Sequence, residues 1–516
     1  MAPVRLLSGF LTVGFWTLCS RVLGFVRDIL IAAYLGTGPV AEAFLVAFSL
    51  PNMFRRFFAE GAFNMAFVPM FSKKVEAGKG AHEFARDALT GLASVLILFT
   101  LIAQLFMPGL VLLMASGFAG DERFDLAVAF GRIAFPYILF ISIAALLSGV
   151  LNATGRFAAA AAAPVLLNVL FIGALWIGGA AGWDTGLTLA WTVPIAGVAQ
   201  MALVWIAASR AGFRLIPTRP HMTPELRRLA IIAAPAALAG GVVQINLLVG
   251  RQVASFFEGA IGWLNYADRL YQLPLGVVGI AVGVVLLPDL SRRLRAGDED
   301  GGGHALSRAG EFALSMTVPA AAALIAIPVT LISVLFERGQ FTAEDSQFTA
   351  QALMVYGLGL PAFVLQKVLQ PLYFAREDTK RPFYFALASL VINAAVAIGL
   401  MGTLGFIAAA WGTTLAAWGM VALLWIWSRN MGAAARFDAR FWTRVPRIFA
   451  ASAIMGVALF WAARVMAPLL AMGGVKYLAL LALVLLGCVV YFGGGHVIGA
   501  FRLGDFKSAL RRGGRG

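Results

Sequence analysis

The stretch SRVLGFVRDILIAAYLG, residues 20–36, places three ionisable side chains inside an otherwise apolar segment. Arg21 and Asp28 are seven residues apart and therefore lie on one face of a helix, and Arg27 stands beside Asp28. An ionised side chain in hydrocarbon costs about 2.5 to 3.5 kcal/mol on insertion scales. The segment therefore predicts a membrane-spanning helix whose charges face a polar interior rather than lipid.

The composition of the whole chain predicts a polytopic membrane protein. Of 516 residues, 61% are hydrophobic and only 13% are charged, which does not suit a water-exposed surface. Apolar runs between polar breaks predict an all-α fold of about 14 transmembrane helices, with loops too short for a sizeable soluble catalytic domain. The approximate spans are 8–36, 40–71, 88–114, 124–151, 157–180, 185–208, 229–257, 260–290, 309–336, 347–374, 382–401, 404–428, 446–468 and 475–501.

The net charge of +15 follows membrane topology and does not indicate a nucleic-acid partner. If the N-terminus is cytoplasmic, most basic residues fall in cytoplasmic loops and in the two termini, and the opposite loops hold only Arg123, Arg338 and Lys476. Both termini are therefore predicted to be cytoplasmic. The start resembles a signal peptide, but no A-x-A site follows and the apolar run continues to Leu35, so we expect a retained first span.

Segments of the first half reappear in the second at nearly constant separation. AFVPMFSKKVEAG at 66–78 matches VLLPDLSRRLRAG at 285–297, and AWTVPIAGVAQMALVWIAASR at 190–210 matches AWGTTLAAWGMVALLWIWSR at 410–429. Pro136 pairs with Pro361 and Asn168 with Asn393 in the same order. These matches predict two parallel six-helix repeats that form two lobes around a central cavity, plus two extra C-terminal helices. The expected domains are an N-lobe at 1–215, a C-lobe at 216–432, and the last two helices with a basic cytoplasmic tail at 433–516.

Further polar and charged side chains lie in predicted spans. Bases outnumber acids among them, so a cavity lined by these residues would prefer an anion. A local ion pair remains an alternative for Arg27 with Asp28 and for Arg56 with Glu60, and a structural role remains open for Arg251 and Lys367. The complete set comprises the bases Arg21, Arg27, Arg55, Arg56, Arg251, Arg269 and Lys367, the acids Asp28, Glu42, Glu60 and Asp268, and the amides Asn52 and Gln272.

Other chemistry is largely absent from the sequence. No G-x-x-x-x-G-K-[ST] or H-E-x-x-H motif occurs, and Cys19 and Cys488 lie at opposite ends of the chain. We therefore expect neither a metal nor a cofactor. A positive cavity would still allow coupling to membrane potential, or to a monovalent cation at an unknown site.

Four segments resemble the signatures of the MurJ/MviN lipid II flippases, in the multidrug/oligosaccharidyl-lipid/polysaccharide exporter superfamily. They are SRVLGFVRD at 20–28, LPNMFRRFFAEGAFNMAFVP at 50–69, FPYIL at 135–139 and YADRLYQLP at 266–274. The similarity in span count and order extends over nearly the whole chain. The resemblance implies that the chain flips undecaprenyl-diphosphate-linked disaccharide-pentapeptide, the peptidoglycan precursor, from the cytoplasmic to the periplasmic leaflet of a bacterial inner membrane.

The resemblance also implies roles for particular residues. The family's critical cavity arginines match Arg21, Arg27, Arg55 and Arg269, and an acidic position after the first span is matched by Glu42. Ser49 stands where some members have Lys, and Gln272 stands where some have Glu, which weakens any mechanism that relies on a carboxylate at 272. The family's last two spans form a lipid-facing groove, which would explain why two helices lie outside the duplication.

Arginine suits a diphosphate because its planar fork makes paired, charge-assisted hydrogen bonds. The predicted mechanism is alternating access, in which two lobes rock about a cationic cavity while the polyprenyl tail stays in lipid. Membrane lipids and cell-wall synthesis proteins are candidate partners. One alternative is an exporter of another anionic lipid-linked oligosaccharide; the other is a polytopic membrane glycosyltransferase or polymerase, which would need catalytic acids on longer outer loops.

Overall fold

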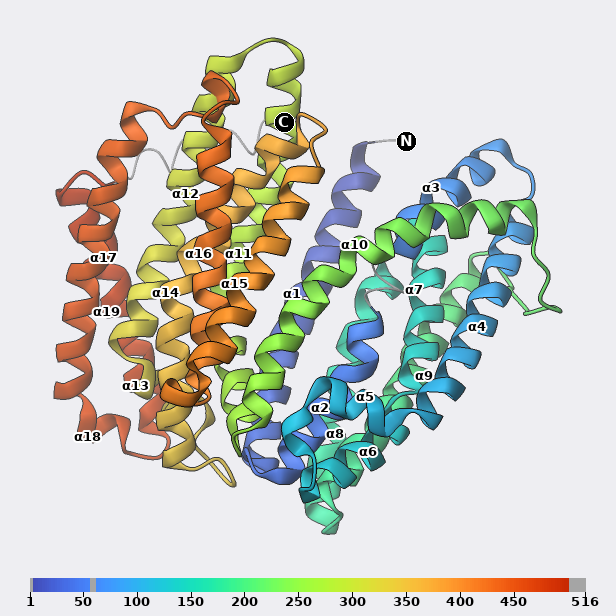
Figure 1. Cartoon of the computed structure of the whole chain (residues 1–516), viewed down its shortest axis with the longest axis horizontal. Helices are drawn as coiled ribbons and strands as arrows, with labels where there is room; N and C mark the ends of the chain where they lie inside the picture. Colours follow the sequence, from blue (N-terminus) through green and yellow to red (C-terminus); the bar gives the residue numbers. More distant parts are fainter. Residues whose placement is uncertain (1–2, 56–61, 501–516) are drawn as a thin grey trace. The chain divides into compact units, whose positions relative to one another are not determined.

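The computed structural model describes residues 3–55 and 62–500 (Figure 1). Within these ranges the chain is built from helices, and the one β-bridge, between Arg338 and Phe341, is isolated. The predicted all-α class is confirmed. In chain order the helices are α1 Pro3–Leu35, α2 Pro39–Arg55, α3 Ala62–Ala77, α4 Ala81–Leu105, α5 Met107–Met114, η2 Ser116–Phe118, α6 Glu122–Ala134, α7 Tyr137–Ala153, α8 Ala158–Ala181, α9 Thr185–Arg210, α10 Pro224–Ser255, α11 Ala260–Arg295, α12 Glu299–Ala326, α13 Pro328–Phe336, α14 Ala343–Phe374, α15 Lys380–Leu404, α16 Ile407–Ser428, η3 Ala433–Ala435, α17 Ala439–Val465, α18 Ala467–Leu470 and α19 Val475–Val497.

Ten helical segments in the described part are long and apolar enough to cross a membrane. They are α4, α6 with α7, α8, α9, α12, α14, α15, α16, η3 with α17, and α19. The four other predicted spans, 8–36, 40–71, 229–257 and 260–290, include every charged cavity candidate except Lys367. The count of fourteen therefore stays a prediction.

Proline breaks two of the predicted spans into shorter helices. Pro136 separates α6 from α7, and Pro328 begins α13 directly after α12 has ended. Proline has no N–H and a fixed φ, so it fits the first turn of a helix better than its interior. Pro361, the repeat partner of Pro136, instead lies inside α14. Pro136 and Pro361 occupy matching positions in the two repeats, but the first separates two helices and the second lies within one helix.

The contacts divide the chain into two compact units. The first comprises Met1–Gly262 with Arg338–Phe341, and the second comprises Trp263–Glu337 with Thr342–Gly516. The first unit extends past the expected lobe boundary at 215 because α10 packs against α3, α4, α5 and η2. The lobes at 1–215, 216–432 and 433–516 were inferred from the repeat rather than from contacts, and they stay a prediction.

In the first unit, α8 packs on both α1 and α9, while α7 lies on α9 and α2 lies on α6. Small residues allow these close approaches. A Cβ added to Gly186 of α9 would come within 2.6 Å of Val40 and 2.7 Å of Phe130. α2, the helix that carries Glu42, is therefore held tightly against α9.

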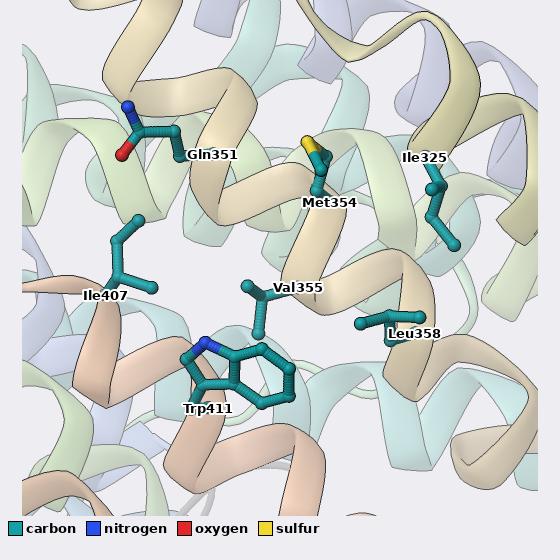
Figure 2. A pocket seen from close by; sticks show the side chains of 7 residues that line it. All are labelled: Ile325, Gln351, Met354, Val355, Leu358, Ile407 and Trp411. Carbon is teal, nitrogen blue, oxygen red and sulfur yellow. The ribbon is translucent and has the colours of Figure 1, made fainter. Parts of the chain in front are cut away.

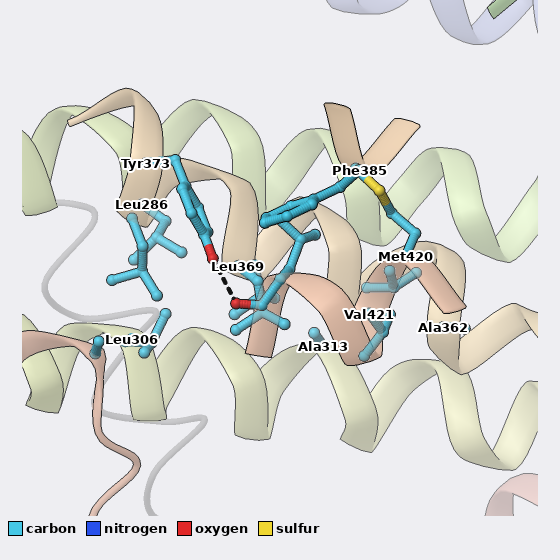
Figure 3. Close-up of a cluster of buried hydrophobic side chains, with 14 of the residues drawn as sticks. Leu286, Leu306, Ala313, Ala362, Leu369, Tyr373, Phe385, Met420 and Val421 are labelled. Carbon is cyan, nitrogen blue, oxygen red and sulfur yellow. Dashed lines mark hydrogen bonds between the residues drawn. The ribbon is translucent and has the colours of Figure 1, made fainter. Parts of the chain in front are cut away.

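In the second unit, α12, α14 and α16 pack together and α15 covers α16. A groove of about 250 Å³ lies between α12, α14 and the first turns of α16, with Trp411 and Leu358 on its walls and Gln351 as its polar lining residue (Figure 2). Toward the end of α14, Tyr373 belongs to a large buried cluster, where its hydroxyl donates to the Leu424 carbonyl oxygen at 2.7 Å (Figure 3). Burying this tyrosine therefore leaves no unsatisfied hydroxyl.

The two helices beyond the repeat, α17 and α19, are attached to the second unit. Met455 of α17 and Leu483 of α19 join Leu314 and Val318 of α12 in one apolar cluster. Tyr491 of α19 also donates a hydrogen bond to the Ser315 carbonyl oxygen at 2.6 Å. α12 therefore anchors the C-terminal pair.

Candidate functional site

Arg27 is the most firmly held of the candidate arginines. Only 8% of it is exposed. Its Nη2 and Nε donate to Asp28 Oδ1 at 2.7 and 3.0 Å, and its Nη1 donates to Asn168 Oδ1 at 3.0 Å. Asn168 in turn donates to the Ser20 carbonyl oxygen at 3.0 Å, which ties α8 to α1. The local ion pair left open by the sequence is present, and both sides of the Arg27 fork are engaged.

Arg21 has a different environment on the same helix. Its side chain is exposed, and no hydrogen bond or ion pair involves it within residues 3–55 and 62–500. It lies six residues before Arg27, whose charge Asp28 already balances. Among the described side chains of α1, Arg21 therefore adds a positive charge that no acid balances.

Glu42 lies at the start of α2 and is fully buried. Its Oε2 accepts from Arg123 Nη1 at 2.8 Å, and its Oε1 accepts from the Ile261 backbone N–H at 3.1 Å. This differs from the predicted place of Glu42 among the cavity charges, because its carboxylate is enclosed by protein. Sequence reasoning had counted Arg123 only as an outer-loop charge. The pair instead joins the first turns of α2, α6 and α11.

Asp121 completes this network at the start of α6. It accepts from the Arg123 backbone N–H at 2.8 Å and from Arg123 Nε at 2.6 Å, so it caps the helix and holds the guanidinium. Burial alone would raise the pKa of the Asp121 carboxyl, but these hydrogen bonds and the positive charge lower it. Arg123 also lies over the Phe118 ring, 4.5 Å from its centroid. Asp121 and Phe118 therefore hold the Arg123 side chain in place independently of its contact with Glu42.

Asn52 and Arg55 lie in the last turn of α2. The Asn52 amide donates to the Phe48 carbonyl oxygen at 2.8 Å, one turn back, beside Pro51. Arg55 is partly buried at the last position of α2. Arg56 and Glu60 lie outside the described residues, so the ion pair suggested between them stays a prediction.

On α11, the Gln272 amide donates a hydrogen bond to Asp268 Oδ2, one turn before it. The sequence had placed Gln272 beside Arg269, but the amide contacts Asp268, the residue just before Arg269. Arg269 is partly buried, and Lys367 is exposed on α14, where none of the described hydrogen bonds or ion pairs includes it.

Arg251 lies near the end of α10, which is fastened to η2. The neighbouring Gln252 accepts from the Ser116 N–H and hydroxyl at 2.8 and 2.7 Å, and Ser255 accepts from the Gly117 N–H at 3.0 Å. Arg251 itself is partly buried and is engaged in an interaction of its own.

The candidates divide between the two units. Each unit holds an acid next to an arginine, Asp28–Arg27 in the first and Asp268–Arg269 in the second. A single shared cavity therefore stays a prediction. The described members of the first unit are Arg21, Arg27, Asp28, Glu42, Asn52, Arg55 and Arg251, and those of the second are Asp268, Arg269, Gln272 and Lys367.

Sequence reasoning missed the role of Asn168, although the repeat had already singled it out. Its match, Asn393, is also fully buried, where α15 meets α16 at Gly412. A matched pair of polar residues in apolar spans was the available signal. Within the described ranges, no group of three or more His, Cys, Asp or Glu side chains could hold a metal ion.

Comparison with known proteins is consistent with this arrangement of helices and charges. A family model described as "Lipid II flippase MurJ" matches residues 31–480. The chain belongs to the MurJ lipid II flippase family. The resemblance carried by the four signature segments is confirmed. MurJ family membership makes the chain a membrane transporter rather than an enzyme, and a multi-pass protein of a bacterial inner membrane.

Individual MurJ relatives match over most of their length. The probable lipid II flippase MurJ of Rhizobium meliloti (strain 1021) is 44% identical over 523 residues, covering 99% of this chain and 97% of the relative. The lipid II flippase MurJ of Burkholderia cenocepacia is 37% identical and covers 76% of this chain and 77% of the relative.

Solved structures show the same fold. A lipid II flippase MurJ in an inward closed conformation has a TM-score of 0.79 at 24% identity, with 94% of this chain and 98% of that chain covered. An inward-facing multidrug resistance MATE transporter of the MOP superfamily has a TM-score of 0.66 at 14% identity, covering 81% and 95%. The MurJ fold of this chain is thus related to that of drug exporters.

Proposed function

We propose that this chain moves lipid II, the undecaprenyl-diphosphate-linked disaccharide-pentapeptide, from the cytoplasmic to the periplasmic leaflet. Family membership supports the substrate class. The observation that carries the proposal is the contrast on α1, where Asp28 and Asn168 engage Arg27 while Arg21 stays exposed. One arginine thus organises the helix, and the other is available for an anion.

Chemistry favours a diphosphate as that anion. A guanidinium offers two parallel N–H donors to phosphate oxygens, a geometry that lysine cannot reproduce. Arg55 on α2 and Arg269 on α11 are proposed as further ligands, with Arg251 and Lys367 as supporting charges. Arg27 is proposed as a positioning residue, because its donors are already committed to protein acceptors.

The proposed mechanism is alternating access by two lobes. The headgroup would occupy the cationic site while the polyprenyl tail stays in the bilayer, beside the exposed apolar faces of α17 and α19. Val457, Trp461 and Val489 are examples of large side chains on these faces. The proposal also includes cytoplasmic termini and a drive by the membrane potential, which supplies about 2.3 kcal/mol per charge per 100 mV.

A flipping assay in proteoliposomes tests the function. The purified chain and a fluorescent undecaprenyl-diphosphate-linked substrate are reconstituted together, and a membrane-impermeant quencher reports the outer-leaflet fraction. The wild-type chain should equilibrate the substrate between leaflets, whereas empty vesicles should not. Equal rates for the substrate and for a dye-labelled phosphatidylcholine would contradict selective transport of the lipid-linked diphosphate.

A further inference from the structure

Three arginines lie around the end of α16 and the start of α17. Arg429 directly follows α16, Arg436 lies just before α17, and Arg447 lies in the third turn of α17. All three side chains are exposed. None of the described carboxylates contacts them, so their charge is not balanced by the part of the protein that the structure describes.

Aromatic residues and a carbonyl fix two of these arginines. The Arg429 guanidinium carbon lies 4.6 Å from the centre of the Trp425 ring, and the centres of the Trp425 and Trp442 rings are 6.3 Å apart. Arg447 Nη1 donates to the Gly499 carbonyl oxygen, just beyond α19, at 3.2 Å. Trp442 is 53% exposed. Trp425 and Trp442 thus bring the end of α16 and the start of α17 together, and Arg447 ties α17 to the residues just after α19.

Three other arginines nearby are already paired with acids. Glu311 is 7% exposed and lies 2.7 Å from Arg308 Nη1, 3.3 Å from Arg440 Nε and 3.6 Å from Arg444 Nη1. Asp438 takes the other side of Arg308 and caps α17. These carboxylates are thus used inside the bundle, and Arg429, Arg436 and Arg447 remain for an external anion.

We propose that Arg429, Arg436, Arg447, Trp425 and Trp442, here named the α16–α19 surface, bind the phosphate headgroup of an anionic bilayer phospholipid. Arginine forks match phosphate oxygens, and tryptophan is favoured at the depth of lipid headgroups. Stacking on Trp425 uses the face of the Arg429 guanidinium and leaves its N–H edges for the phosphate.

Phe449 is exposed on the same face of α17, seven residues after Trp442, and would receive the acyl chains. The occupant is a phospholipid of the surrounding bilayer rather than the transported lipid. That it belongs to the cytoplasmic leaflet rests on the proposed orientation of the termini. Such a lipid would fix the C-terminal helix pair relative to the membrane surface.

Retention of phosphatidylglycerol by the purified full-length chain, measured by native mass spectrometry, tests the α16–α19 surface. The test variant carries Arg429→Gln, Arg436→Gln and Arg447→Gln. The control carries Arg214→Gln, Arg219→Gln and Arg228→Gln, which removes the same charge from exposed positions of the first unit. We expect affinity to fall about fivefold per arginine, on the order of a hundredfold in total, in the test variant and to change less than about twofold in the control.

Three outcomes would overturn the proposal. One is equal weakening in the test and control variants, which would indicate a general effect of charge. Another is equal retention of phosphatidylcholine and phosphatidylglycerol by the wild-type chain. The third is displacement of the bound phosphatidylglycerol by undecaprenyl diphosphate, which would assign the surface to the transported lipid. If the triple variant does not fold, Arg436→Gln alone, outside the helices, should still show about a fivefold loss.

Discussion

Glu42 of α2 and Arg123 of α6 form a fully enclosed ion pair across 81 residues of sequence, with 2.8 Å between Oε2 and Nη1. A third element, the first turn of α11, donates the Ile261 N–H to the same carboxylate. The pair therefore fastens three helix starts. Its main contribution is expected to be structural rather than to ligand binding.

Removing one partner of this pair should destabilise the protein. Arg123→Ala leaves the buried Glu42 carboxylate without its charged partner, at a cost of about 3 to 5 kcal/mol, whereas Glu42→Ala should cost less because Asp121 still pairs with Arg123. The double variant should lose less than the sum of the two single losses. Unfolding of the purified variants in detergent measures this. Arg132→Ala, at an exposed position of the same helix, is the control, and additive losses in the double variant would show that the two residues act separately.

Asn168→Ala should weaken both the stability and the transport activity of the chain. The change removes the acceptor of Arg27 Nη1, and a hydrogen bond to a charged group contributes about 1.5 to 3 kcal/mol. Arg27→Lys should not restore activity, because an ammonium cannot reach Asp28 and Asn168 with the same fork. Unfolding and flipping assays on each variant measure these effects, with the exposed Asn152→Ala as control. Wild-type behaviour of Asn168→Ala would show that Arg27 does not depend on this contact.

Gln272→Glu should impair transport by replacing an amide donor with a second carboxylate one turn from Asp268. We expect a higher substrate concentration for half-maximal flipping, without complete loss. Adding Asp268→Asn should restore much of the lost transport, because the new amide at position 268 can donate a hydrogen bond to the new carboxylate at position 272. A gain of transport in Gln272→Glu alone would mean that a carboxylate is preferred at position 272.

Local sequence patterns predicted the fold well because helix periodicity, hydropathy and charge placement are properties of neighbouring residues. They identified the α1 charges and allowed for the Arg27–Asp28 pair, whose partners are adjacent. They did not predict that Asn168 would contact Arg27 or that Arg123 would contact Glu42, because these contacts join residues 141 and 81 positions apart. Nor did the repeat predict that α10 packs with the first unit. Such contacts depend on how the helices pack against one another, and the residue pattern of a single helix does not predict that packing.

The central claim is that Arg21 supplies a charge for the lipid-linked diphosphate rather than for the fold. The most direct measurement is the proteoliposome flipping rate of Arg21→Ala, compared with Arg21→Lys and with Arg210→Ala at an exposed position at the end of α9. We expect Arg21→Ala to lose transport while its abundance and unfolding temperature match those of the wild-type chain. Arg21→Lys should recover part of the transport rate, and Arg210→Ala should transport at the wild-type rate. Full transport by Arg21→Ala, or loss of the folded protein in place of loss of transport, would contradict the claim.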